Sequence, residues 1–230
     1  MTSGKPDDQA ARNDSSPGPA AVTFVTTEHF TLQGARSSTI SESTGRAGMF
    51  LATVSGGLVA IGLLATATRV GAAFYAFCLI ILPTLAFVGL VTFDRVLQSG
   101  IEDHEYARRI AALRGFYFEQ APELAGYLVS VPPAERLRLQ GLRGGLWQGF
   151  LTVAGMVGLV TAVLTGSAAG VLAGLASGHS LAAAIASGAA VAAAVLTGLM
   201  RYQREAWKQI SATALFAGED QVPDQDRPPW

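Results

Sequence analysis

Charged side chains are scarce in this chain, and their scarcity is the first indication of its class. Asp, Glu, Lys and Arg make up 14% of the 230 residues, whereas soluble domains carry about 25%. The 16 cationic residues nearly balance the 17 acidic ones, which leaves a net charge of −1. No overall basic field therefore exists to hold a nucleic-acid backbone. With half of its residues apolar, the chain is predicted to be an integral membrane protein that does not bind nucleic acid.

Cysteine is nearly absent as well. Cys78 is the single cysteine, so no disulfide can form within the chain. Its apolar neighbours suit a thiol that acts as a small hydrophobic group. The first 20 residues contain aspartates and prolines but no apolar core of the kind that a cleavable secretory signal needs. We expect residues 1–26 to form a retained, disordered polar tail.

Long runs without any charge predict the fold class. The hydrocarbon core of a bilayer is about 30 Å thick, and an α-helix crosses it with roughly 20 apolar residues. From residue 144 to residue 200 no side chain carries a formal charge, and this run of 57 positions is long enough for two crossings. The polar, flexible residues Ser177 to Ser180 are predicted to form the turn between them. The fold is therefore predicted to be all-α, with four transmembrane helices arranged as two hairpins. The predicted spans are residues 47–68, 70–93, 146–175 and 181–200.

Small residues recur every four positions along three of the spans. Such a file stays near one side of a helix, where it lets another backbone approach closely. The fourth span contains nine alanines among its 20 residues, so we expect it to be stabilised by pairing with the third. Contact within one chain and contact between copies both remain open. The files are Ala154, Gly158, Ala162, Gly166, Gly170, Gly174 and Gly178 on the third span; Ala182, Ala186, Ala190, Ala194 and Gly198 on the fourth; and Gly48, Ala52, Gly56 and Ala60 on the first.

The distribution of cationic residues predicts the orientation. Four precede the first span, one lies in its short loop, seven lie between the second and third spans, and four follow the last. Fifteen of the 16 therefore share one side, which the positive-inside rule makes cytoplasmic. The protein is predicted to lie in a cell membrane with both termini in the cytoplasm, and with short outer loops near Arg69 and His179. Trp147, Tyr202 and Trp207 fall near the predicted inner boundary.

The segment between the hairpins, residues 94–143, is predicted to be helical and cytoplasmic. Its first part should continue the second span, with Pro122 at or beyond its end and Pro133 opening a short second helix. The predicted apolar face comprises Leu97, Ile101, Ile110, Leu113 and Tyr117. The predicted segments are a tail (1–26), a juxtamembrane helix with the first hairpin (27–93), the cytoplasmic segment (94–143), the second hairpin (144–200), a C-terminal juxtamembrane helix (201–217) and a disordered tail (218–230).

The sequence contains none of the common catalytic or ligand-binding motifs. It contains no G-x-x-x-x-G-K-[ST] phosphate loop, H-E-x-x-H zinc helix or G-x-S-x-G nucleophile elbow. Consecutive helical residues cannot converge on one ion, so Glu102 to Glu105 are interpreted as a solvated helical face. The spans lack the ionisable residues typical of proton relays, and their hydroxyls are expected to bond to local backbone. We predict no catalytic, cofactor-binding or metal-binding residues, no cofactor and no enzymatic activity.

Four short motifs lie where the spans meet the predicted cytoplasm. They are Phe30-Thr-Leu-Gln-Gly-Ala-Arg36-Ser37, Thr92-Phe93-Asp-Arg95-Val-Leu-Gln98, Ala121-Pro122-Glu123-Leu124 and Trp147-Gln148-Gly-Phe150-Leu-Thr152. Through them, residues 24–210 resemble an uncharacterised family of bacterial four-span integral membrane proteins with no assigned activity. The resemblance implies the same four-span architecture and location in a bacterial inner membrane, and it carries no functional residues.

Three functions follow as hypotheses. The first is a non-enzymatic interaction or scaffold component, whose partners are the lipid bilayer and either further copies of itself or a protein at the cytoplasmic face. The second is an oligomeric pore or membrane-disrupting effector. The third, a membrane-bound enzyme, would need acids or bases at the cytoplasmic boundary, for which the candidates are Asp94, Glu102, Asp103, Glu119 and Glu123.

Overall fold

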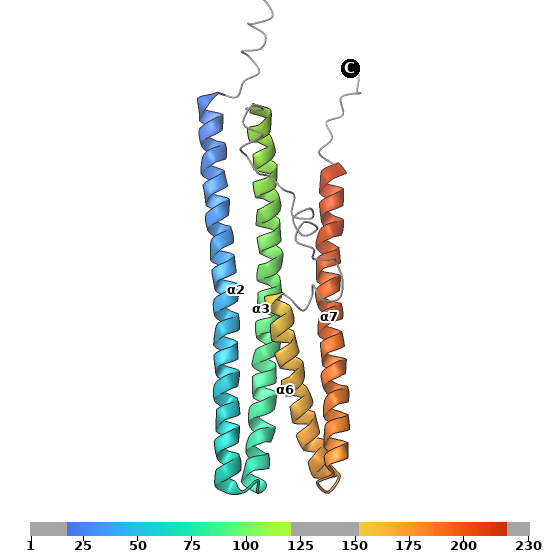
Figure 1. Cartoon of the computed structure of the whole chain (residues 1–230). Helices are drawn as coiled ribbons and strands as arrows, with labels where there is room; N and C mark the ends of the chain where they lie inside the picture. The colour runs from blue at the N-terminus through green and yellow to red at the C-terminus, as the bar shows by residue number, and fades with distance from the viewer. Residues whose placement is uncertain (1–17, 121–151, 220–230) are drawn as a thin grey trace, which may run out of the picture. The chain divides into compact units, whose positions relative to one another are not determined.

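Four long helices make up the regular structure of the described chain (Figure 1). The computed structural model describes residues 18–120 and 152–219, and no strand occurs in these two ranges. This confirms the all-α prediction for them. Each helix contains a stretch long and apolar enough to cross a membrane. The helices are α2 (Pro19–Thr68), α3 (Ala72–Gln120), α6 (Val153–Ala176) and α7 (Leu181–Glu219).

Three of the helices extend well beyond the charge-free runs. The 50 residues of α2 correspond to about 75 Å at 1.5 Å per residue, more than twice the thickness of a hydrocarbon core. Helix α2 begins at Pro19, which suits a first helical position. Residues 19–26 are therefore helical, although they were expected to belong to a disordered tail. Helix α3 continues past Asp94, as predicted, and α7 runs without a break through residues 201–217.

Several expectations fall outside the described residues. These are the two tails at 1–17 and 220–230, the end of a helix near Pro122, the short helix at Pro133, and the boundary position of Trp147. The third span was expected from residue 146, and its described part begins with Thr152, which caps α6.

The chain divides into two compact units. Their described parts are residues 18–40 with 102–120, here called the two-helix unit, and residues 41–101 with 152–219, here called the four-helix unit. All four charge-free runs belong to the four-helix unit.

The core of the four-helix unit centres on a close approach of three helices. Phe50 of α2 and Thr161 of α6 both contact Gly89 of α3, and any Cβ at position 89 would collide with their side chains. Phe93 and Val157 are each 1% exposed beside this contact, and Thr161 is fully buried. Glycine at position 89 therefore allows α2 and α6 to approach the same point on α3.

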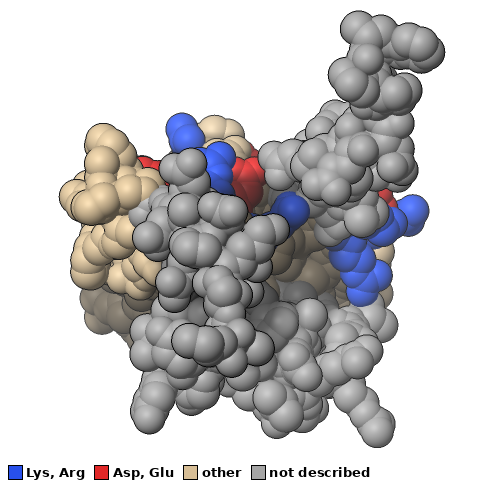
Figure 2. Space-filling view, turned by 90° about the horizontal axis from the view of Figure 1, so that it is seen from above, with Lys and Arg blue, Asp and Glu red and all other residues tan. Residues whose placement is uncertain are grey.

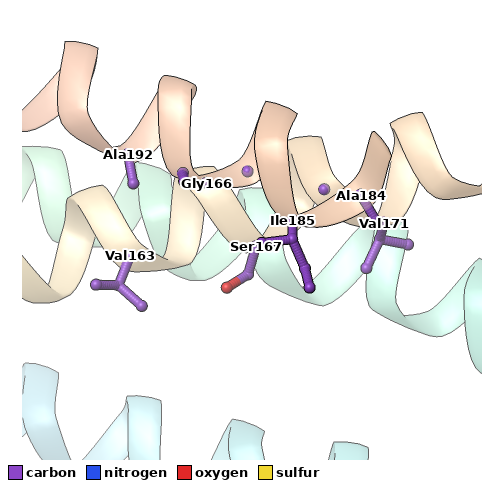
Figure 3. A pocket seen from close by; sticks show the side chains of 10 residues that line it. Val163, Gly166, Ser167, Val171, Ala184, Ile185 and Ala192 are labelled. Carbon is purple, nitrogen blue, oxygen red and sulfur yellow. The ribbon is translucent and has the colours of Figure 1, made fainter. Parts of the chain in front are cut away.

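Helices α6 and α7 pack even more closely, backbone against backbone (Figure 3). A Cβ at Gly166 would lie 2.5 Å from the Gly188 carbonyl oxygen, and one at Gly170 would lie 2.8 Å from that of Ala184. The predicted file on the third span thus faces α7 at these positions. Figure 3 also shows a groove along this contact, and Val163, Ser167 and Ile185 are among the residues that line it.

The predicted file on the fourth span does not face α6. All five of its residues are exposed, and α7 presents Ala184, Gly188 and Ala192 to α6 instead. A helix containing so many alanines offers several small-residue files, and spacing alone does not distinguish between them. On the first span, Gly48, Ala52 and Gly56 are likewise exposed, and nothing lies within 4 Å of a Cβ at Gly48 or Gly56.

Large apolar side chains cover much of the outer surface. In the most apolar 18-residue stretch of α6, 39% is buried, whereas only 6% of the corresponding stretch of α7 is buried. Leu63, Ile80, Phe87 and Leu181 each expose about two thirds or more of their surface. Soluble proteins do not leave such continuous apolar surface in water, whereas lipid accepts it.

The two turns of the four-helix unit lie at the same end (Figure 1). Tyr75, which follows the α2–α3 turn, stacks edge-to-face with His179 of the α6–α7 turn, with ring centroids 5.7 Å apart. Arg69 and Val70 both adopt positive φ angles, 47° and 56°. This left-handed conformation is costly for a β-branched residue such as Val70.

Replacing Gly170 with leucine should destabilise the α6–α7 contact. The added side chain must displace the Ala184 backbone, and we expect a loss of about 1–3 kcal/mol in the free energy of unfolding. Reversible unfolding in mixed micelles measures this loss. Gly198→Leu is the matched control because nothing lies within 4 Å of a Cβ at Gly198. Equal losses in both variants would contradict the close contact.

Replacing Val70 with glycine should stabilise the protein. Relief of the left-handed strain outweighs the added backbone entropy of glycine, and we expect a gain of about 0.5–1 kcal/mol. The same unfolding assay tests this, with Val59→Gly, an exposed position inside α2, as a control that should lose stability. A loss in Val70→Gly would argue against the strained turn.

Candidate functional site

The candidate site is the end of the four-helix unit opposite the two turns, where the charge-free runs give way to charged sequence. Seen from above, Figure 2 shows Lys and Arg side chains close to Asp and Glu side chains. Asp94 and Arg95 follow the second run, Arg46 precedes the first, and Arg201 follows the fourth. Polar groups gather here because the ends of the charge-free runs on different helices lie close together.

Asp94 joins α3 to α7 at this end. Its Oδ1 accepts a hydrogen bond from the Tyr202 hydroxyl at 3.0 Å, and its Oδ2 accepts one from Gln98 Nε2 at 2.8 Å. The hydrogen bond and negative charge of Asp94 raise the pKa of the Tyr202 phenol above its ordinary value. The sequence predicts Tyr202 at this boundary but not its partner, which is 108 residues away. With its oxygens accepting hydrogen bonds, Asp94 acts here as a structural acceptor.

Gln203 joins α7 to α6 beside this pair. Its side chain is 5% exposed, and its Nε2 donates to the Thr152 hydroxyl at 3.4 Å. The Thr152 oxygen also accepts from the Gly155 amide at 3.0 Å, so it caps α6. Gln203 Oε1 is buried without a hydrogen-bond partner. The burial of Gln203 cannot be predicted from the sequence, since a polar residue just beyond a span gives no periodic signal of burial.

A groove between α2 and α3 opens at the same boundary. It encloses about 190 Å³ and is lined by Arg46 and Arg95 together with apolar and threonine side chains. Arg46 also bonds to Glu42 at 2.7 Å, and both side chains of that pair are about half exposed. Trp207, predicted at the boundary, lies 3.9 Å from the position of a Cβ on Gly100.

The two-helix unit contains the acidic cluster from Glu102 to Glu105. Asp103 differs from the solvated face that the sequence indicated, because its carboxylate pairs with Arg36 at 2.7 Å and is 27% exposed. Arg36 therefore links α2 to α3 within this unit. Phe24 and Phe30 lie on the α2 part of the same unit and are 74% and 67% exposed.

The described residues bring together no group of three or more His, Cys, Asp and Glu that could hold a metal ion. Of the enzyme candidates, Asp94 and Asp103 are engaged as above and Glu102 is exposed. The side chain of Glu119 and all of Glu123 lie outside the part of the chain that can be described.

Most hydroxyls in the spans bond to their own helix, as predicted. The Thr161 hydroxyl, for example, donates to the Val157 carbonyl oxygen at 2.8 Å. The same local bond is made by Thr53, Ser55, Thr66, Thr92, Thr165, Ser187 and Thr197. These hydroxyls therefore present methyl or methylene groups, and not donors, to their surroundings.

Comparison with known proteins identifies no relative of this chain. No family model, no curated protein and no solved structure matches the chain. The resemblance to four-span bacterial membrane proteins therefore stays a prediction.

Replacing Tyr202 with phenylalanine should remove the link between α7 and Asp94. We expect a loss of about 1 kcal/mol in the free energy of unfolding at neutral pH. Tyr75→Phe is the control, since the described interaction of Tyr75 is through its ring, and we expect it to change stability by less than about 0.5 kcal/mol.

The Tyr202 link should also weaken in alkali. A phenol whose pKa is raised by folding stabilises the folded state below its ordinary pKa of about 10, and this contribution disappears as pH rises through the folded value. The stability difference between the wild type and Tyr202→Phe should therefore shrink above pH 10. A difference that grows with pH would contradict the hydrogen bond to Asp94.

Proposed function

We propose that this protein is a non-enzymatic, multi-pass membrane protein that acts as an interaction or scaffold component through its cytoplasmic helices. In this proposal the four-helix unit crosses a bacterial inner membrane as two hairpins, and the two-helix unit lies in the cytoplasm. Protein partners or further copies of the chain bind at the cytoplasmic face. The proposal requires no cofactor.

The charge distribution supports the proposed orientation. Fifteen of 16 cationic residues precede the first charge-free run, separate the second from the third or follow the fourth, and Arg69 alone falls between the first and the second. Cationic loops favour the cytoplasmic side. The meeting of the two turns at one end of the four-helix unit agrees with an even number of crossings.

The exposed aromatic side chains of the two-helix unit carry the proposal of a binding function. Phe24 and Phe30 expose about 70% of their surface on a helix that also bears Glu28 and Arg36. This stretch lies outside the charge-free runs, so lipid does not account for the exposure. Large exposed apolar groups among polar ones mark protein contact sites.

A pore is the second candidate, favoured by the exposed small-residue files on α2 and α7. These files leave room for helices of other copies. Within one chain, however, the local hydroxyl bonds leave few donors to line a polar path. Flux across reconstituted liposomes separates the two candidates, because a scaffold leaves the bilayer sealed.

Reporter fusions test the orientation. Alkaline phosphatase and a fluorescent protein fused in turn to each chain end should both indicate the cytoplasm. A fusion at His179 should indicate the opposite side. Reporters that place the two ends on opposite sides would contradict the even number of crossings.

Replacing Phe24 and Phe30 with serine tests the binding function. Full-length protein in nanodiscs should form self-complexes or retain a co-purified partner in native mass spectrometry, and the double variant should weaken this association at least tenfold, since two buried aromatic anchors are each worth about 1 kcal/mol or more. Thr23→Ser with Thr27→Ser is the exposed control on the same helix. A wild type that is strictly monomeric and free of partners would contradict the proposal.

A further inference from the structure

The groove between α2 and α3 combines two arginines with apolar walls. Arg46 and Arg95 line it from opposite helices. Arg46 immediately precedes the first charge-free run, and Arg95 lies two residues after the second. The cationic lining therefore lies at the boundary between charged and charge-free sequence, while the rest of the groove extends along the runs.

The groove walls offer almost no hydrogen bonding apart from the two guanidinium groups. Met49, Val88 and Val91 supply apolar surface. The two threonines of the lining have hydroxyls that donate to their own helices, Thr53 to the Met49 carbonyl and Thr92 to the Val88 carbonyl, each at 2.8 Å. A matching ligand must therefore have an anionic end and an apolar remainder.

The two arginines retain capacity for an anion. Arg95 bonds to the Gln98 amide oxygen at 3.4 Å, and no carboxylate of the described residues forms an ion pair with it. Arg46 pairs with Glu42, but exposed pairs of this kind are weak and exchange readily. Counting Glu42, the groove lining keeps a net charge of about +1, which complements a singly charged phosphodiester.

We propose that this groove binds one anionic phospholipid of the bilayer. The phosphodiester bridges Arg46 and Arg95, and the adjoining part of one acyl chain lies along Met49, Val88 and Val91. Arginine is well suited to phosphate because its planar donors match two oxygens. The volume of about 190 Å³ is below the roughly 300–1,000 Å³ of enclosed small-molecule sites. It suffices for a lipid, because the surrounding bilayer covers the rest of that molecule.

Native mass spectrometry of the full-length protein tests the site. Protein is released from detergent that contains equal amounts of phosphatidylglycerol and phosphatidylcholine, and the wild type should retain phosphatidylglycerol preferentially. Arg46→Gln with Arg95→Gln should weaken this binding roughly 25-fold, about fivefold for each arginine. The matched control is Arg201→Gln with Arg204→Gln, which removes two arginines near the same boundary outside the groove and should change binding less than twofold.

The apolar wall is tested by filling it. Val91→Trp should reduce phosphatidylglycerol binding at least fivefold, whereas Val59→Trp, at an exposed α2 position outside the groove, should leave it unchanged. Soluble glycerol phosphate at millimolar concentration should not displace the lipid, because it lacks the chain that contacts the wall. Circular dichroism of each variant verifies that the helices are intact.

Several results would overturn the lipid site. They are equal losses in the two arginine pairs, no preference over phosphatidylcholine, full displacement by glycerol phosphate, or occupation of the groove by a second copy of the chain. The site requires the proposed membrane location but not the scaffold function. Lipid adducts that persist while all protein association is absent would reject the scaffold alone.

Discussion

The close approach of backbones at glycine is the contact on which the four-helix unit depends. In water, burial of apolar surface drives helices together, but lipid tails are as apolar as leucine and remove that drive. Dispersion contacts then have to come from proximity. Gly166, Gly170 and Gly188 bring α6 and α7 together backbone to backbone, and Gly89 admits Phe50 and Thr161 to the surface of α3. Large side chains such as Leu63 and Phe87 can consequently face outward, where lipid solvates them.

Polar contacts perform a different task at the charged end of this unit. Tyr202 and Gln203 are adjacent on α7, yet one bonds to Asp94 of α3 and the other to the cap residue of α6. Directional hydrogen bonds therefore fix α3, α6 and α7 relative to one another at this end of the unit, which the small side chains of the close contacts cannot do. The same level carries Arg46 and Arg95, so the position of the cationic groove depends on how α2 and α3 align around Phe50 and Gly89.

The charge-free runs predict where the apolar helices lie, whereas the spacing of small residues does not fix which face of each helix makes contact. Charge-free runs locate the apolar helices because the cost of placing an ion in lipid is large and independent of the helix's neighbours. The file of Gly166 and Gly170 was identified as a contact face. On α7, Ala182 and Ala184 belong to different files of similar composition, and it is the file of Ala184 that faces α6. Helix starts were also missed, since Pro19 opens a helix in sequence whose composition indicated a tail.

The sequence by itself determined that this is an all-α chain with four helices apolar enough to cross a membrane, and that its cationic residues are divided unequally among the segments between the charge-free runs. Both properties depend on the order of apolar and charged residues along the chain, because the free energy of transfer into lipid is set mainly by each residue's own side chain. The tertiary structure alone decided which small residues meet, that Asp94 receives Tyr202, and that Arg46 and Arg95 share a groove. Those pairings join residues tens of positions apart, and they depend on the rotation of each helix about its axis, which only packing against the other helices sets.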